Sequence, residues 1–150
     1  MKDPKKGILP SHYDLAEKQK LLYSKEISTE RRVKIAELLI QEGKYCEALE
    51  YLEQAKDEGK IKEVMEKAVE EGDYFSLAYA EKVSGLKVEA DRWGRLGEKA
   101  EKLGKYSYAL KAYQAGNNTE KYNKLKEKLT PSEGEDLKPS LSNKEGTQNE

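Results

Sequence analysis

Apolar residues recur three and four positions apart through most of this chain, which is the spacing of amphipathic helices. The clearest stretch places bulky or small residues on one face of each of two consecutive helices: Trp93, Leu96 and Ala100, then Ala109 and Tyr113. Between the two groups stands Gly104, a residue that readily adopts the left-handed backbone of a helix C-terminus. The pattern predicts two helices joined by a short turn, which must then pack antiparallel.

The same order of residues occurs twice more along the chain. A strong copy spans residues 30 to 57 around Gly43, and a weaker copy spans residues 61 to 83 around Gly72. The three turn glycines are 29 and 32 residues apart. In the strong copy Arg32 stands where Trp93 stands in the last one. The sequence therefore predicts about three helical hairpins with nearly regular spacing.

Shorter patterns flank the hairpins. Ser11-x-x-Asp14 after Pro10 resembles a helix start and predicts a helix over about residues 12 to 27. A long helix is predicted from Leu86 to Leu103. Asn118 or Thr119 is expected to begin a last helix, apolar on one side only, as the closing helix of a stack requires.

Composition separates the ends from this helical region. Residues 1 to 10 contain Pro4, Gly7 and Pro10 and are predicted to form a flexible arm. Residues 130 to 150 are rich in Pro, Ser, Gly and Glu, which predicts a disordered acidic tail. The domain organisation expected from the sequence is therefore an arm, a helical-repeat domain over residues 11 to 129, and a tail.

Charge and rare residues narrow the function classes. Charged residues make up 38% of the chain, yet the net charge is only -1, which argues against an electrostatic nucleic-acid binder. The single Cys and single His predict neither a disulfide framework nor a metal site, and no phosphate-binding loop or catalytic pair is evident. We expect no enzymatic activity, no cofactor and no membrane span, and a cytoplasmic location.

The hairpin patterns resemble tetratricopeptide repeats. Trp93-x2-Leu96-Gly97-x2-Ala100 and Ala109-x3-Tyr113 match that family's two helices in turn, and the last repeat also resembles helical hairpins of vesicle-coat subunits. The resemblance implies an all-α solenoid of about three antiparallel helix pairs with flanking N- and C-terminal helices. Its structural repeat positions would be Ala36, Gly43, Ala48, Gly72, Trp93, Gly97, Gly104 and Ala109.

The resemblance also implies a concave surface, lined by the first helix of each hairpin, that holds a peptide or partner helix. The groove-facing position would carry Glu37, Glu66 and Glu98, an acidic stripe suited to a basic ligand. The alternative is that these are solvated carboxylates neutralised by nearby lysines, for which Lys62, Lys67 and Lys99 are candidates. Three tyrosines are candidates for exposed, partner-contacting aromatics, with ordinary partial burial as the alternative: Tyr51, Tyr79 and Tyr108.

The sequence therefore predicts a non-catalytic module or scaffold for protein–protein interaction. Two other classes stay open, a helical-repeat RNA-binding protein and an enzyme of unrecognised type. RNA binding would require a basic groove with stacking aromatics, which the groove glutamates disfavour. Self-association through a poorly capped end of the stack is a further expectation.

Overall fold

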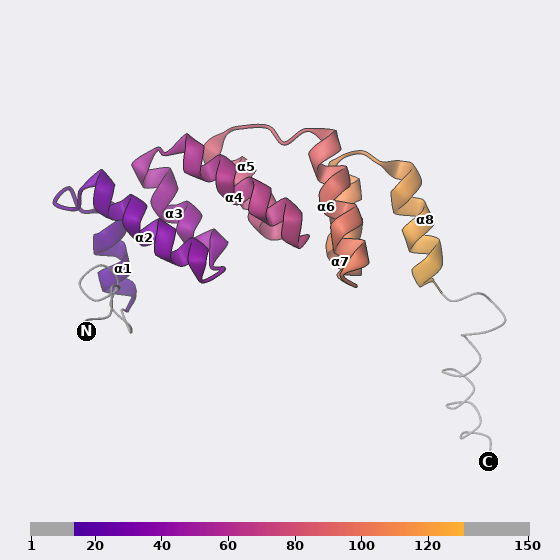
Figure 1. The fold of residues 1–150 in the computed structure, drawn as a ribbon, viewed down its shortest axis with the longest axis horizontal. Coiled ribbons are helices and arrows are strands. Elements are labelled where there is room, and N and C mark those ends of the chain that lie inside the picture. Colours follow the sequence, from indigo (N-terminus) through magenta and orange to yellow (C-terminus); the bar gives the residue numbers. More distant parts are fainter. Residues whose placement is uncertain (1–13, 131–150) are drawn as a thin grey trace, which may run out of the picture.

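A computed structural model describes residues 14 to 130, which form helices and connecting turns without a strand. The helices follow one another along a row in which α1 and α8 lie at opposite ends (Figure 1). Their bounds are α1 Leu15–Tyr23, α2 Thr29–Gln41, α3 Tyr45–Ala55, α4 Glu58–Glu71, α5 Tyr74–Ser84, α6 Ala90–Lys102, α7 Tyr106–Ala115 and α8 Thr119–Leu129.

Three antiparallel hairpins make up the middle of the row. They are α2 with α3, α4 with α5, and α6 with α7, the pairs that pack most extensively in the molecule. Between hairpins, α4 packs on α6, whereas α3, α5 and α7 pack in series on the other side. The predicted all-α stack of three helix pairs with flanking helices is confirmed.

The flanking helices continue the same spacing. The residues that precede the first helix of each hairpin, and α8, are Ser28, Asp57, Glu89 and Asn118, at intervals of 29, 32 and 29 residues. Those that precede α1 and the second helices are Asp14, Lys44, Asp73 and Lys105, at intervals of 30, 29 and 32. By position in the repeat, α1 is a second helix and α8 is a first helix, and the described part of the chain contains the partner helix of neither.

Small residues set the distance between the helices of this stack. Ala36, Ala48, Gly97 and Ala109 are all buried, as the repeat pattern predicted. A Cβ added to Gly97 would lie 2.4 Å from Cε1 of Tyr113, so α6 and α7 approach as closely as a glycine allows. Between hairpins, a Cβ added to Gly72 would lie 2.7 Å from the Cα of Ala100.

Arg32 stands where the last hairpin has the aromatic Trp93, and its guanidinium binds α1 to the first hairpin. Its Nε donates to the carbonyl oxygen of Leu21 at 3.0 Å, and its Nη2 donates to that of Ser24 at 2.7 Å. These carbonyls end α1, where a helix has acceptors without partners and favours positive charge. A cation therefore replaces the packing role that Trp93, which is 3% exposed, has in the last hairpin.

Two predicted helices are shorter than the pattern indicated. The first begins at Leu15, because Asp14 accepts the N–H of Glu17 at 2.9 Å, and it ends at Tyr23 rather than near residue 27. The hydroxyl of Ser24 accepts the N–H of Glu26 at 3.1 Å, a local bond that competes with helix continuation. Ser11, the expected helix start, lies outside the described residues.

The helix predicted from Leu86 begins only at Ala90. The preceding residues are not helical, because side chains bind their backbone groups: the hydroxyl of Ser84 accepts the N–H of Leu86, and Glu81 accepts that of Val88 at 2.7 Å. Val88 is 3% exposed, so burial also holds this non-helical connection in place.

The arm over residues 1 to 10 and the tail from residue 131 lie outside the described residues. Within residues 14 to 130, no helix combines the length and the apolar character needed to cross a bilayer.

We predict that Gly97→Ala destabilises the fold, whereas Gly94→Ala on the same helix stabilises it. The new Cβ at residue 97 would collide with the buried Tyr113 ring, and we expect a loss of about 1–2 kcal/mol in the free energy of unfolding. At residue 94 the new Cβ meets nothing within 4 Å. Removing a glycine there should gain about 0.5–1 kcal/mol. Urea unfolding of both variants measures the difference, and equal stabilities would contradict this packing.

Candidate interaction site

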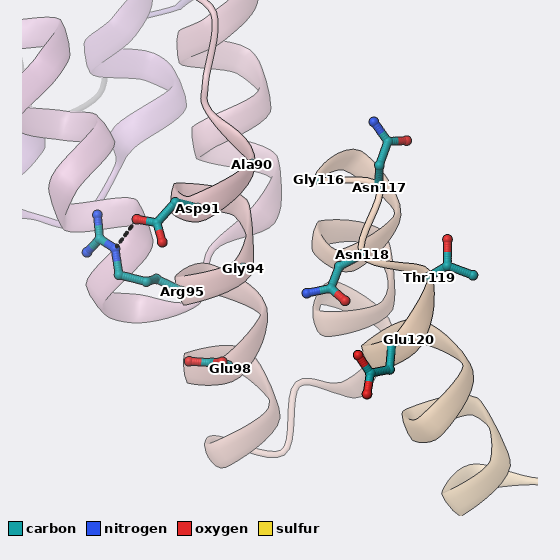
Figure 2. Close-up of a pocket in the computed structure, with 10 residues that line it drawn as sticks. All are labelled: Ala90, Asp91, Gly94, Arg95, Glu98, Gly116, Asn117, Asn118, Thr119 and Glu120. Carbon is teal, nitrogen blue, oxygen red and sulfur yellow. Dashed lines mark ion pairs between the residues drawn. The ribbon is translucent and has the colours of Figure 1, made fainter.

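The last helix leaves a furrow open beside α6. Helix α8 packs on α7 and has few contacts with α6. Two cavities of about 550 and 530 Å³ lie along this junction. We call them the Gly94 cavity and the Tyr106 cavity. The Gly94 cavity is lined by the N-terminal half of α6 and by residues 116 to 120 (Figure 2).

Residues with little or no side chain line α6 and the α7–α8 turn in the Gly94 cavity. They are Ala90, Gly94 and Gly116. A Cβ added to Gly116 would lie 2.9 Å from Cβ of Trp93, so that glycine is needed for packing. A Cβ added to Gly94 meets no atom within 4 Å, so the space beside it is open. The backbone of α6 is therefore accessible to a ligand at Gly94.

Carboxylates outnumber cations around the Gly94 cavity. Asp91, Glu98 and Glu120 contribute three carboxylates against the one guanidinium of Arg95. Arg95 lies 3.7 Å from Asp91. Figure 2 shows Glu120 at the start of α8, on the side that faces α6, whereas Thr119 points away from α6. Among residues 14 to 130, Glu120 has no ion-pair partner, so its charge remains available to a ligand.

An ion pair between Glu98 and Lys121 crosses the furrow between the two cavities. It belongs to a regular series, because Glu37 lies 3.0 Å from Lys60 and Glu66 lies 3.3 Å from Arg92. Each pair joins one first helix to the next first helix. The glutamate is always nine residues after its helix's N-cap, and the cation is always three residues after its own.

This series corrects the picture of an acidic stripe. Each predicted glutamate already has a cation, supplied by the following repeat and not by the expected Lys62, Lys67 or Lys99. Lys62 instead lies 3.5 Å from Glu58. The hydrogen bond to Glu37 raises the pKa of Lys60, which keeps that cation charged. Of the three glutamates, only Glu98 lines the Gly94 cavity.

The Tyr106 cavity is more apolar and lies at the other end of the furrow. Tyr106 is 44% exposed, and Leu125 and the Tyr113 ring are buried behind it. The Tyr113 hydroxyl donates to Glu101 at 2.8 Å, and burial together with this bond raises the pKa of Tyr113. Lysines stand around this cavity: Lys102, Lys121, Lys124 and Lys128.

The tyrosines expected at a partner surface have three different environments. Tyr51 is fully buried, which corrects the expectation of an exposed ring: its side of α3 faces the core. Tyr79 is partly buried, and this burial raises its pKa. Tyr108 is partly buried and stands edge-on to Phe75, with ring centroids 5.3 Å apart. None of the three lines either cavity.

The residues that sequence reasoning missed are Gly94, Asp91 and Glu120. The sequence does indicate Gly94, because a glycine inside a helix lowers the stability of that helix and so needs a structural or functional explanation. No feature of the sequence singles out Asp91 or Glu120, since acidic residues are common in the first turn of a helix, where they interact favourably with the helix dipole. Phe75, half exposed on α5, was also missed as a surface aromatic.

Comparisons of the chain with protein-family models, with curated proteins and with solved structures found no match.

A buried tyrosine in the first hairpin predicts an alkaline loss of stability. Burial of Tyr45 and the hydrogen bond from its hydroxyl to Glu71 raise its pKa to about 12. The unfolded chain loses this proton near pH 10, so the native state binds more protons above that pH. The contribution of the Tyr45 hydroxyl to the free energy of unfolding is complete below pH 10 and is lost as the pH rises to 12. Relative to Tyr45→Phe, we expect the native chain to lose about 2 kcal/mol over that range.

The measurement is urea unfolding at several pH values for the native chain and Tyr45→Phe. Tyr106→Phe is the matched control, because the Tyr106 ring is exposed, and it should follow the native curve. If the free energy of unfolding falls equally with pH in all three proteins, the fold does not raise the pKa of the Tyr45 hydroxyl.

Proposed function

We propose that this chain is a tetratricopeptide-like interaction module that holds a basic peptide segment or partner helix on its first-helix face. The repeat pattern of the sequence supports this, and so does the stack of three hairpins with a common direction. The observation that carries the proposal is the Gly94 cavity, which combines an open glycine with an excess of carboxylates. The chain would act by reversible binding and not by catalysis.

The open backbone at Gly94 explains how a ligand could approach. A side chain at this position would fill the space between α6 and the start of α8. With glycine there, a ligand side chain can lie against α6, with its aliphatic part on Ala90 and Gly94. Lysine and arginine suit this environment, because they have long apolar stems and a charged head.

The charged head of such a side chain would meet Glu120. This carboxylate is exposed and has no ion-pair partner within the described part of the chain, whereas Glu98 and Asp91 already have cations. An exposed ion pair contributes about 0–1 kcal/mol, so charge alone would give weak binding. The fit against Gly94 must supply most of the specificity.

The Tyr106 cavity extends the proposal to a second ligand residue. It lies beyond the Glu98–Lys121 ion pair, and it offers the exposed Tyr106 ring beside the buried Leu125. An apolar side chain would bury part of the Tyr106 ring there. The proposed ligand therefore has a basic residue and an apolar residue, one for each cavity.

We predict that Gly94→Leu weakens ligand binding without unfolding the protein. Peptides selected on the full chain from a random twelve-residue phage library provide the probe, and we expect them to be enriched in Lys or Arg. Leucine at position 94 would occupy the cavity, so the selected peptides should bind at least about tenfold more weakly, equivalent to 1.4 kcal/mol. Fluorescence anisotropy with labelled peptides measures the affinity.

A matched control separates binding from folding. Lys99→Leu adds the same side chain five residues further along α6, at an exposed position that lines neither cavity. It should bind the peptides normally, while Glu120→Gln should weaken the basic ones only. Selected peptides without basic residues, or equal binding by Gly94→Leu, would refute the proposed site.

A further inference from the structure

The two ends of the stack are complementary halves of one hairpin. Helix α1 has the position of a second helix and α8 has that of a first helix, and residues 14 to 130 contain the partner helix of neither. If two copies of the chain met end to end, α8 of one copy and α1 of the next would stand as first and second helix. Among residues 14 to 130, a second copy of this chain therefore supplies a helix of the matching repeat position for either end.

The ion-pair series would also continue across such a junction. Glu127 lies nine residues after the N-cap of α8, the position of Glu37, Glu66 and Glu98. Arg31 lies three residues after the N-cap of α2, the position of Lys60, Arg92 and Lys121. Glu127 is exposed and has no ion-pair partner among residues 14 to 130. In charge and spacing, the two ends match.

Two lysines disfavour contact between the two ends. Eight residues after the N-cap, the first helices carry Ala36, Met65 and Gly97, all buried, whereas α8 carries the exposed Lys126. Four residues after the N-cap, the second helices carry Ala48, Leu77 and Ala109, each 0% exposed, whereas α1 carries Lys18. In the last hairpin, Gly97 at the first of these positions lies against the Tyr113 ring of the second helix.

We propose that Lys18 and Lys126 prevent copies of this chain from joining end to end. In a joined pair, both ammonium groups would enter the interior of the composite hairpin, where like charges repel and each must lose its water. In the single chain Lys126 is exposed, with its ammonium 5.6 Å from the centre of the Tyr122 ring, whereas Lys18 is partly buried, with its ammonium 2.7 Å from Glu50. The lysines thus act against an association that the repeat geometry otherwise favours.

This inference is independent of the proposed ligand, because neither lysine lines the Gly94 cavity. We predict that the native full chain has a constant mass of 17.1 kDa at every concentration in sedimentation equilibrium. The double variant Lys18→Ala/Lys126→Ala should gain mass with rising concentration. Growth should not stop at the dimer, because a head-to-tail junction leaves a free end on each side.

Two further variants make the test specific. Lys20→Ala/Lys124→Ala removes the same charge from exposed positions on the same two helices and should stay monomeric. Adding Glu127→Lys to the assembling variant should shift its assembly to higher concentration. The proposal is overturned if the native chain assembles or if the folded double variant stays at 17.1 kDa. It is also overturned if adding Glu127→Lys leaves the concentration at which the double variant assembles unchanged. Circular dichroism confirms folding, and peptide binding by the double variant should be unchanged.

Discussion

Close approach of helix backbones at small residues is the constraint on which this structure depends. The face of α6 at Gly97 lies directly on the Tyr113 ring, and Gly72 lies against the backbone of Ala100. The first contact sets the distance within a hairpin, and the second sets the distance between hairpins. Because interiors are packed without gaps, a single methyl group at either position would push the helices apart. The common direction of the stack follows from these distances.

The furrow beside α8 follows from the same constraint. Helices α4 and α6 approach closely, whereas α8 carries Lys126 at the position that is buried in every complete hairpin. It packs on α7 and leaves α6 partly uncovered. The Glu98–Lys121 ion pair spans the resulting gap but is exposed, and such pairs contribute little to stability. The series of ion pairs therefore fixes which residues face each other more than it holds the helices together.

The sequence predicted the hairpins well, because their signals are local. A turn glycine and small residues at helical spacing determine a hairpin whatever surrounds it. Partners from other repeats were harder to find: Arg32 binds carbonyls of α1, and the groove glutamates bind cations one repeat further on. The connection before α6 was missed for a similar reason. The apolar pattern of α6 extends back to Leu86 in the sequence. In the structure, however, the Ser84 and Glu81 side chains accept the backbone N–H groups of Leu86 and Val88, and these residues are not helical.

The contrast between Gly94 and Gly97 shows what a structure adds to such a pattern. In the sequence, both are glycines inside one predicted helix, three residues apart. Gly97 has no room for a side chain, so packing accounts for it. Gly94 has room, and an alanine there would favour the helix by about 0.5–1 kcal/mol. Packing therefore does not account for Gly94, and carboxylates surround the open space beside it, which is the observation behind our proposal that a ligand binds there.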